Sequence, residues 1–137
     1  QQTLNRAYER DRELTNTIRE LGCPILPLRD RTLLVPLVGG IDGERAQQII
    51  ESVLDGVRQY QAHTILLDVT GVPLVDTQVA SSLLQTADAA RLLGAQTIMV
   101  GVRPEIAQSI VGLGLDLRQL ATYPTLASAL ASLVQRG

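Results

Sequence analysis

The chain has 137 residues, which fits one domain of ordinary size, and 45% of them are apolar, which is enough to fill a core. The net charge is -2 and no segment is a charged tail, which argues against binding to nucleic acid or to an anionic membrane. Every cation is arginine, so lysine-dependent P-loop and Schiff-base chemistry is excluded. A single histidine and a single cysteine exclude a multi-histidine metal site and an internal disulfide.

Residues 1–22 form the first unit of the sequence. Apolar residues recur there at heptad positions, with Asp11 in the same seam: Leu4, Ala7, Leu14, Ile18 and Leu21. The pattern predicts a linker helix that ends at Gly22, because Pro24 cannot continue it. This helix is either a dimeric connector from an upstream domain or a terminal helix lying on its own domain. Because the chain begins with Gln1, we expect a fragment or a processed form of a longer protein, with the folded domain at residues 23–137.

The domain begins with two predicted strands, residues 24–28 and 31–38, joined by a turn at Arg29 and Asp30. Pro27 and Pro36 restrict those positions to sheet edges or bulges, because proline cannot donate to a ladder. Asp42 is a good helix N-cap, and an apolar stripe at helical spacing follows it. The stripe consists of Ala46, Ile49, Ile50, Val53, Leu54 and Val57.

Helices and strands alternate in the rest of the chain. Buried strands are predicted at residues 64–69 and 97–102, and a last strand at residues 119–122. Between them lie a helix ending near Gly94 and a short helix from Pro104 to residues 112–114. A final helix at residues 124–135 is expected to turn inward Leu126, Ala129, Leu130 and Leu133. This order predicts an α/β fold with a mixed, mostly parallel β-sheet, whose antiparallel edge is the opening hairpin.

Several residue groups invite a chemical interpretation. The glycine-rich stretch 39–43 follows a strand and opens a helix, so it is either a tight turn or a phosphate cradle. Asp68, Asp76 and Asp88 are either turn and capping residues or ligands of a cation. Cys23 has no histidine near it in the sequence, and His63 is expected to lie at the end of a helix, so neither indicates a catalytic residue.

Residues 68–77, DVTGVPLVDT, leave a buried strand and enter a helix at Asp76 and Thr77. Helical spacing places Thr77 on the solvent side of the first turn, on a polar face with Ser81, Gln85 and Asp88. Thr77 is therefore a first-turn hydroxyl, or a phosphate acceptor at a helix start that favours an anion. The helix after Arg103 offers a parallel case. Its spacing turns Ile106 and Ile110 inward and leaves Glu105 and Ser109 exposed.

Two stretches carry a family resemblance: DVTGVPLVDTQVA at residues 68–80 and GVRPEIAQSIVGLGLDL at residues 101–117. In combination they resemble the STAS domain, named after sulphate transporters and anti-sigma factor antagonists. More narrowly, they resemble the RsbR-type co-antagonists that build the bacterial stressosome. The resemblance covers residues 24–135, and the strand and helix order read above agrees with the STAS arrangement.

The resemblance implies a non-catalytic, cytoplasmic scaffold of the bacterial stress response, without cofactor or metal. A switch-type serine/threonine kinase would bind it and phosphorylate Thr77. Ser109 stands where the family has a second threonine, so it is the second expected acceptor. Other STAS-domain scaffold proteins are expected partners, in a homodimer or a larger assembly. The expected partner-binding residues are Asp68, Asp76, Thr77, Ser81, Glu105 and Ser109. The alternative is a sensory STAS module that binds a nucleotide or another small ligand in the loops after Val38, Asp68 and Val102.

Overall fold

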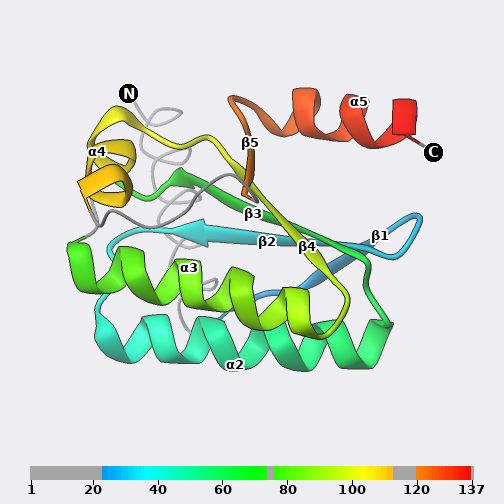
Figure 1. The fold of residues 1–137 in the computed structure, drawn as a ribbon, viewed down its shortest axis with the longest axis horizontal. Coiled ribbons are helices and arrows are strands. Elements are labelled where there is room, and N and C mark those ends of the chain that lie inside the picture. The colour runs from blue at the N-terminus through cyan, green and yellow to red at the C-terminus, as the bar shows by residue number, and fades with distance from the viewer. Residues whose placement is uncertain (1–22, 74–75, 113–119, 137) are drawn as a thin grey trace, which may run out of the picture.

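A computed structural model of the chain describes residues 23–73, 76–112 and 120–136, so the predicted linker helix of residues 1–22 lies outside the described residues (Figure 1). The elements follow the predicted order of strands and helices. They are β1 (Leu26–Leu28), β2 (Thr32–Val38), α2 (Gly43–Tyr60), β3 (Thr64–Gly71), α3 (Thr77–Leu92), β4 (Gln96–Val100), α4 (Pro104–Gly112), β5 (Ala121–Tyr123) and α5 (Leu126–Arg136).

The strands form one five-stranded sheet in the order β1-β2-β3-β4-β5. β1 runs antiparallel to β2, and the pairs from β2 to β5 are parallel, which confirms the predicted mixed sheet with an antiparallel edge. Pro27 lies in the edge strand β1. Pro36 lies beyond the last β1–β2 pair, Leu26 with Leu34, and the register with β3 shifts between Pro36 and Val38. Both prolines therefore occupy positions where a missing N–H is tolerated.

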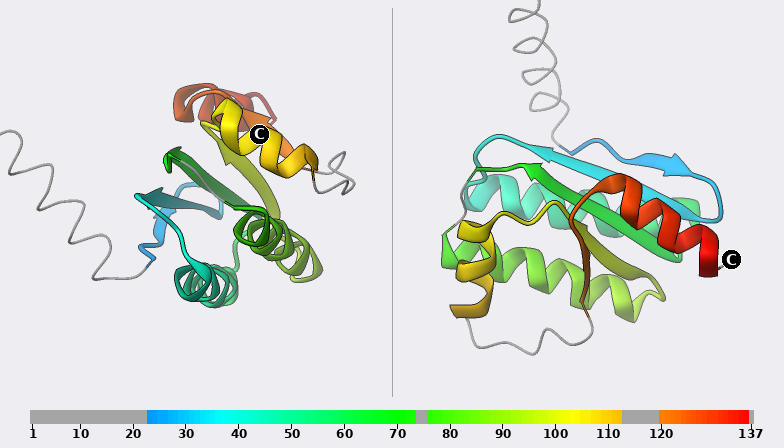
Figure 2. Two further views of the ribbon diagram at one scale, coloured as in Figure 1. Left: turned by 90° about the vertical axis from the view of Figure 1, so that its left-hand side faces the viewer. Right: turned by 90° about the horizontal axis from the view of Figure 1, so that it is seen from above.

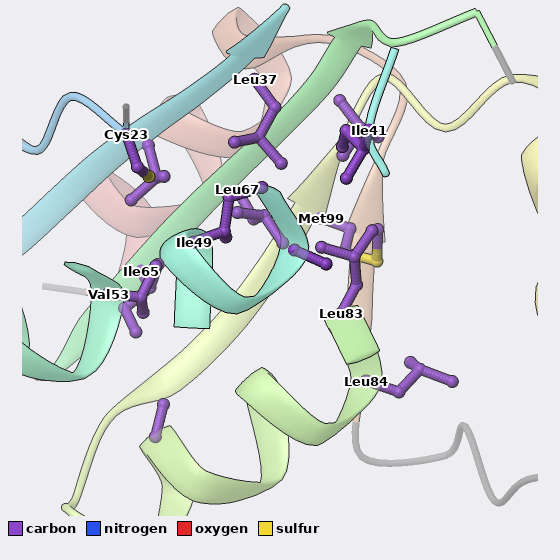
Figure 3. Close-up of a cluster of buried hydrophobic side chains, with 14 of the residues drawn as sticks. Cys23, Leu37, Ile41, Ile49, Val53, Ile65, Leu67, Leu83, Leu84 and Met99 are labelled. Atoms are coloured by element: carbon purple, nitrogen blue, oxygen red, sulfur yellow. The ribbon is translucent and has the colours of Figure 1, made fainter. Parts of the chain in front are cut away.

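The sheet is covered on both faces. Helices α2 and α3 lie side by side on one face and α5 lies on the other (Figures 1 and 2). The larger core lies under α2 and α3, and Figure 3 shows side chains of the sheet, among them Leu37, Leu67 and Met99, beside Ile49 and Leu83 of the two helices. The α5 face holds a smaller cluster, whose fully buried members are Leu66, Ile98, Val100 and Ala129.

Local capping explains where the helices begin. The Asp42 carboxylate accepts a hydrogen bond from the Arg45 N–H at 2.8 Å, so α2 starts at Gly43, as predicted. The final helix starts at Leu126 rather than at residue 124, because the Thr125 hydroxyl accepts the Ser128 N–H at 3.1 Å and caps it. Among the described residues, no helix is both long enough and apolar enough to span a membrane.

Besides shifts of one or two residues in several element bounds, the predicted turn and one predicted inward-facing residue are wrong. The opening hairpin turns through three residues, 29–31, since Leu28 pairs with Thr32, and both Asp30 and Arg31 have positive φ angles. Leu130, predicted to point inward, is 36% exposed. Its neighbours on α5 behave as predicted, because Ala129 is buried and Leu126 and Leu133 pack on the sheet. A single helix on this face buries a narrower stripe than the sequence pattern offers.

Candidate functional site

The predicted site residues gather at the edge where the parallel strands end. β3 and β4 both terminate there, and α3 and α4 both begin there (Figure 1). This is the edge at which open α/β sheets place their ligand and partner sites. Four of them lie at this edge (Asp68, Asp76, Thr77 and Glu105), and the half-buried Ser81 and Ser109 lie about one turn further along α3 and α4. We call these six predicted residues the carboxyl-edge surface.

Thr77 is the first residue of α3 and is exposed. Asp76 is the N-cap, and its carboxylate accepts the Val79 N–H at 2.7 Å while its carbonyl oxygen accepts the Ala80 N–H at 3.0 Å. Val79 and Ala80 are buried, which fixes the opposite face of the first turn against the core. The cap and the core together hold Thr77 on the solvent side of a well-defined helix start.

The carboxylates at this edge have local partners. The Asp68 carboxylate accepts the Thr70 N–H at 2.9 Å, which closes a turn at the end of β3. Asp88 lies near the other end of α3, away from this edge, and is 3.6 Å from Arg91 in an exposed ion pair. Within the described ranges, no group of three or more histidine, cysteine or acidic residues could hold a metal ion. Asp68 and Asp76 thus hold a turn and a helix cap, and Asp88 takes part in an ion pair.

Ser109 lies on α4, and its surroundings differ from those predicted. It is half-buried rather than exposed, and its hydroxyl donates to the Glu105 carbonyl oxygen at 3.1 Å. Ile106 and Ile110 are buried as predicted, and Glu105 is exposed. The short α4 packs closely against the core, and this leaves less of the Ser109 side chain open to solvent than helical spacing alone suggested.

The glycine-rich stretch 39–43 is a turn around an arginine. Gly39 has a φ of 80°, and its N–H donates to the Gly71 carbonyl oxygen at 2.9 Å. Arg45 Nη1 donates to the carbonyl oxygens of Val38 at 2.6 Å and Gly40 at 3.1 Å. A phosphate cradle presents N–H groups to its ligand. Here carbonyl oxygens face a guanidinium, so the tight-turn interpretation fits the structure better.

Cys23 and His63 are not among the residues of the carboxyl-edge surface. Cys23 is buried, and desolvation raises the pKa of its thiol to about 11, against a smaller opposing effect of Arg45. A thiol with so high a pKa is a poor nucleophile. His63 is exposed between α2 and β3, and its Nε2 lies 3.3 Å from Arg31 Nη1.

Sequence reasoning did not single out three residues that join the loops of this edge. Gly101 directly follows β4 and has a φ of 74°, Thr70 of β3 packs directly on it, and Arg103 Nε donates to the Thr70 carbonyl oxygen at 3.2 Å. A glycine at the end of a buried strand was the available signal, since such positions favour a positive φ. The contact with Thr70, which is distant in the chain, has no signature in the sequence.

Comparison with known proteins agrees with this geometry. The profile of the STAS domain family matches residues 24–129. The chain is 48% identical over 109 residues to the RsbT co-antagonist protein RsbRA of Bacillus subtilis, covering 80% of this chain and 40% of that protein. It is 47% identical over 115 residues to RsbRD of the same organism, covering 84% of this chain and 41% of that protein. The chain thus spans about two fifths of the length of these relatives.

Solved structures show the same relationship. A serine-to-glutamate variant of RsbS from Moorella thermoacetica superposes with a TM-score of 0.72 at 27% identity, covering 83% of this chain and 96% of that one. A chain of the stressosome, described as a signal integration and transduction hub, superposes with a TM-score of 0.68 at 26% identity, covering 82% and 97%. The chain belongs to the STAS domain family, and within that family it resembles the RsbT co-antagonist proteins.

Proposed function

We propose that this domain is a non-catalytic regulatory scaffold of the stressosome type, which binds a switch-type serine/threonine kinase and is controlled by phosphorylation of Thr77. The observation that carries the proposal is the exposed Thr77 at the start of α3, in a chain 48% identical to an RsbT co-antagonist protein. Other STAS-domain proteins are the proposed co-assembling partners, which accords with the similarity to RsbS and to the stressosome chain.

The physical basis of the switch is a change of charge at a helix start. A phosphothreonine carries about -1.5 to -2 charges at neutral pH. The first turn of α3 tolerates an anion, because its dipole and free N–H groups favour negative charge. A docked partner, by contrast, must desolvate that anion beside Asp76, which is itself exposed. The modification therefore leaves the fold intact and lowers the affinity for the partner that docks on the carboxyl-edge surface.

Ser109 is the proposed second acceptor and is expected to react more slowly than Thr77. Its hydroxyl donates to the Glu105 carbonyl oxygen at 3.1 Å and the residue is half-buried, so the kinase must first break this bond and turn the side chain outward. No such rearrangement is needed at the exposed Thr77. The order of the two modifications therefore follows from the accessibility of the two side chains.

The test is phosphorylation with a purified switch-type kinase and ATP, followed by site mapping with mass spectrometry. We expect phosphate on Thr77 first, none at that position in Thr77→Ala, and retained modification in Thr77→Ser, which keeps a hydroxyl. Thr77→Asp should bind the kinase about tenfold more weakly than the isosteric neutral variant Thr77→Asn. If Thr77 stays unmodified while the kinase phosphorylates a control substrate, the proposal is wrong.

A further inference from the structure

The sheet face that carries α5 is covered on one side only. One apolar row crosses all five strands on this face, because its members are paired in register: Leu26, Leu34, Leu66, Ile98 and Ala121. Leu66 and Ile98 are fully buried, whereas Leu34 is half-buried and Leu26, at the β1 end, is 46% exposed. Among the described elements, α5 lies over the β3–β5 side of the sheet and leaves β1 and β2 open (Figure 2).

The open side of this face is apolar and carries no charge on β1 or β2. Besides Leu26 and Leu34, it includes Leu28, which is 39% exposed, and the half-buried Pro36. We call Leu26, Leu28, Leu34 and Pro36 the open sheet face. Two neighbouring strands are together about 10 Å wide, which is the width of one helix. The open sheet face therefore has room for one more helix beside α5.

α5 lacks the charged outer side that is usual for a helix with one side in water. Residues 126–134 contain no charged residue, whereas α2 contains five. The outer side of α5 includes the exposed Ala127 and Ala131, whose small side chains allow another surface to approach the helix closely. A helix that is uncharged all round is typical of one covered on both sides, and the sheet of its own chain covers α5 on one side only.

Two larger apolar side chains of α5 lie on the side of the helix that faces β1 and β2. The hydroxyl groups of Ser132 and Tyr123 are hydrogen-bonded at 2.5 Å, so Ser132 lies on the side that faces β5. Leu130 and Val134 are each two residues from Ser132, which places them on nearly the opposite side of the helix. They are 36% and 79% exposed. The open sheet face and this side of α5 thus form one apolar surface.

We propose that the open sheet face binds α5 of a second copy of this chain, so that the two α5 helices lie side by side between the two sheets. The second copy supplies an uncharged helix where this face lacks one, and its own open sheet face covers the outer side of the first α5. Each copy gives and receives the same helix, so the arrangement is twofold symmetric. A charged partner would lose its hydration against this surface without gaining an opposite charge, whereas α5 has no charge to desolvate.

This contact goes beyond the proposed function, which names STAS-domain partners but assigns them no surface. α3 lies on the opposite face of the sheet from α5, so the contact does not cover Thr77 at the start of α3 (Figure 2). The contact needs neither a kinase nor a phosphate group. Its test is therefore independent of the role of Thr77, and either proposal can fail without the other.

The first measurement is the dissociation constant of the dimer, by analytical ultracentrifugation of the full chain. Leu26→Lys and Val134→Lys each place a charge in the contact, one on the sheet and one on the helix, and should raise the constant about tenfold or more. The control is Leu92→Lys. Leu92 is 86% exposed at the end of α3, on the opposite face of the sheet, so the constant should stay within about twofold.

All three of these side chains are exposed in a single copy, so the variants are expected to fold. An unchanged constant in Leu26→Lys and Val134→Lys overturns the proposal. A full chain that stays a single copy at about 0.1 mM also overturns it. The surface would then be open to a different protein.

The second measurement shows which surface the dimer covers. A thiol reagent is applied to the dimer fractions of Val134→Cys and Leu92→Cys, in which the native Cys23 is buried and reacts slowly. The two positions are 79% and 86% exposed in a single copy, so similar rates are expected unless a partner covers one of them.

We expect Val134→Cys to react at least about tenfold more slowly than Leu92→Cys in the dimer, because access limits the reaction. Equal rates overturn the proposal, whatever holds the two copies together. Slow reaction of Val134→Cys that persists after dilution to a single copy also overturns it, because a segment of the same chain is then the cover.

Discussion

Cys23 shows how one buried group sets the response of this fold to alkaline pH. Burial raises the pKa of its thiol from 9.0 to about 11 in the folded chain. Between these values the unfolded chain releases the thiol proton and the folded chain keeps it. The unfolded state then binds fewer protons, so the free energy of unfolding falls as pH rises through this window. Below pH 9 both states keep the thiol proton, so this loss of unfolding free energy does not occur.

The prediction concerns the difference between the unaltered chain and Cys23→Ala. The unaltered chain should lose about 1 kcal/mol more stability than Cys23→Ala when the pH is raised from 8 to 10. Urea unfolding at both pH values measures this, and the comparison cancels every other titrating group. Because the chain has no lysine, few other groups titrate in this range. An equal loss of unfolding free energy in the two proteins between pH 8 and pH 10 would contradict the raised pKa of Cys23.

At the scale of the elements, the junction from β4 to α4 is constrained at Gly101. Gly101→Ala should destabilise the fold by about 2 kcal/mol or more, because an alanine there has both a disfavoured φ of 74° and a clash with Thr70. Gly43→Ala is the control. Gly43 opens α2, and a Cβ atom there has no neighbour within 4 Å, so its stability should change by less than about 0.5 kcal/mol. The measurement is the midpoint of thermal unfolding of the two variants. Equal midpoints for Gly101→Ala and Gly43→Ala would contradict the close contact between Gly101 and Thr70.

The elements themselves were largely predictable because they depend on local signals. Asp42 predicted the start of α2, which it caps. Pro36 predicted a position outside regular strand pairing, and the register shift lies directly after it. Ser109 and Leu130 were misjudged, because their exposure depends on how closely a short or single helix packs on its neighbours. Helical spacing predicts which side of a helix faces the core, but it does not predict how wide a strip of that side is buried.

At the candidate site, too, the local features could be predicted from the sequence and the long-range contacts could not. Thr77 and its cap Asp76 are adjacent in sequence and follow a strand, so the helix start could be predicted and was found. Thr70 contacts Gly101 and Arg103, which lie about thirty residues further along the chain. Arg45 donates a hydrogen bond to the Val38 carbonyl oxygen at the end of β2. Such contacts arise only when the sheet brings the ends of neighbouring strands together. Local patterns therefore predicted the helix start at Thr77, and they did not predict these long-range contacts.

At the scale of the whole molecule, the two faces of the sheet differ in how many apolar side chains they bury. The face under α2 and α3 contains the larger buried cluster, which also takes in Ile106 and Ile110 of α4. Among the described residues, the cluster under α5 has four fully buried members, and only Ala129 of these belongs to the helix. Leu130 and Val134 of α5 are 36% and 79% exposed. A hydrogen bond between the hydroxyl groups of Tyr123 and Ser132, at 2.5 Å, connects α5 to β5.

This imbalance predicts that α5 opens before the rest of the domain. Local opening is easiest where few apolar contacts must be broken, so amides of α5 should exchange at least about a hundredfold faster than those of α2 and β3. Native-state hydrogen exchange of the isolated chain measures this. Leu133→Ala, which removes a side chain packed on the sheet, should speed exchange in α5 alone. The matched change Leu67→Ala in the larger core should lower the stability of the whole domain. Exchange of α5 at the rate of β3 would show instead that the two faces unfold as one unit.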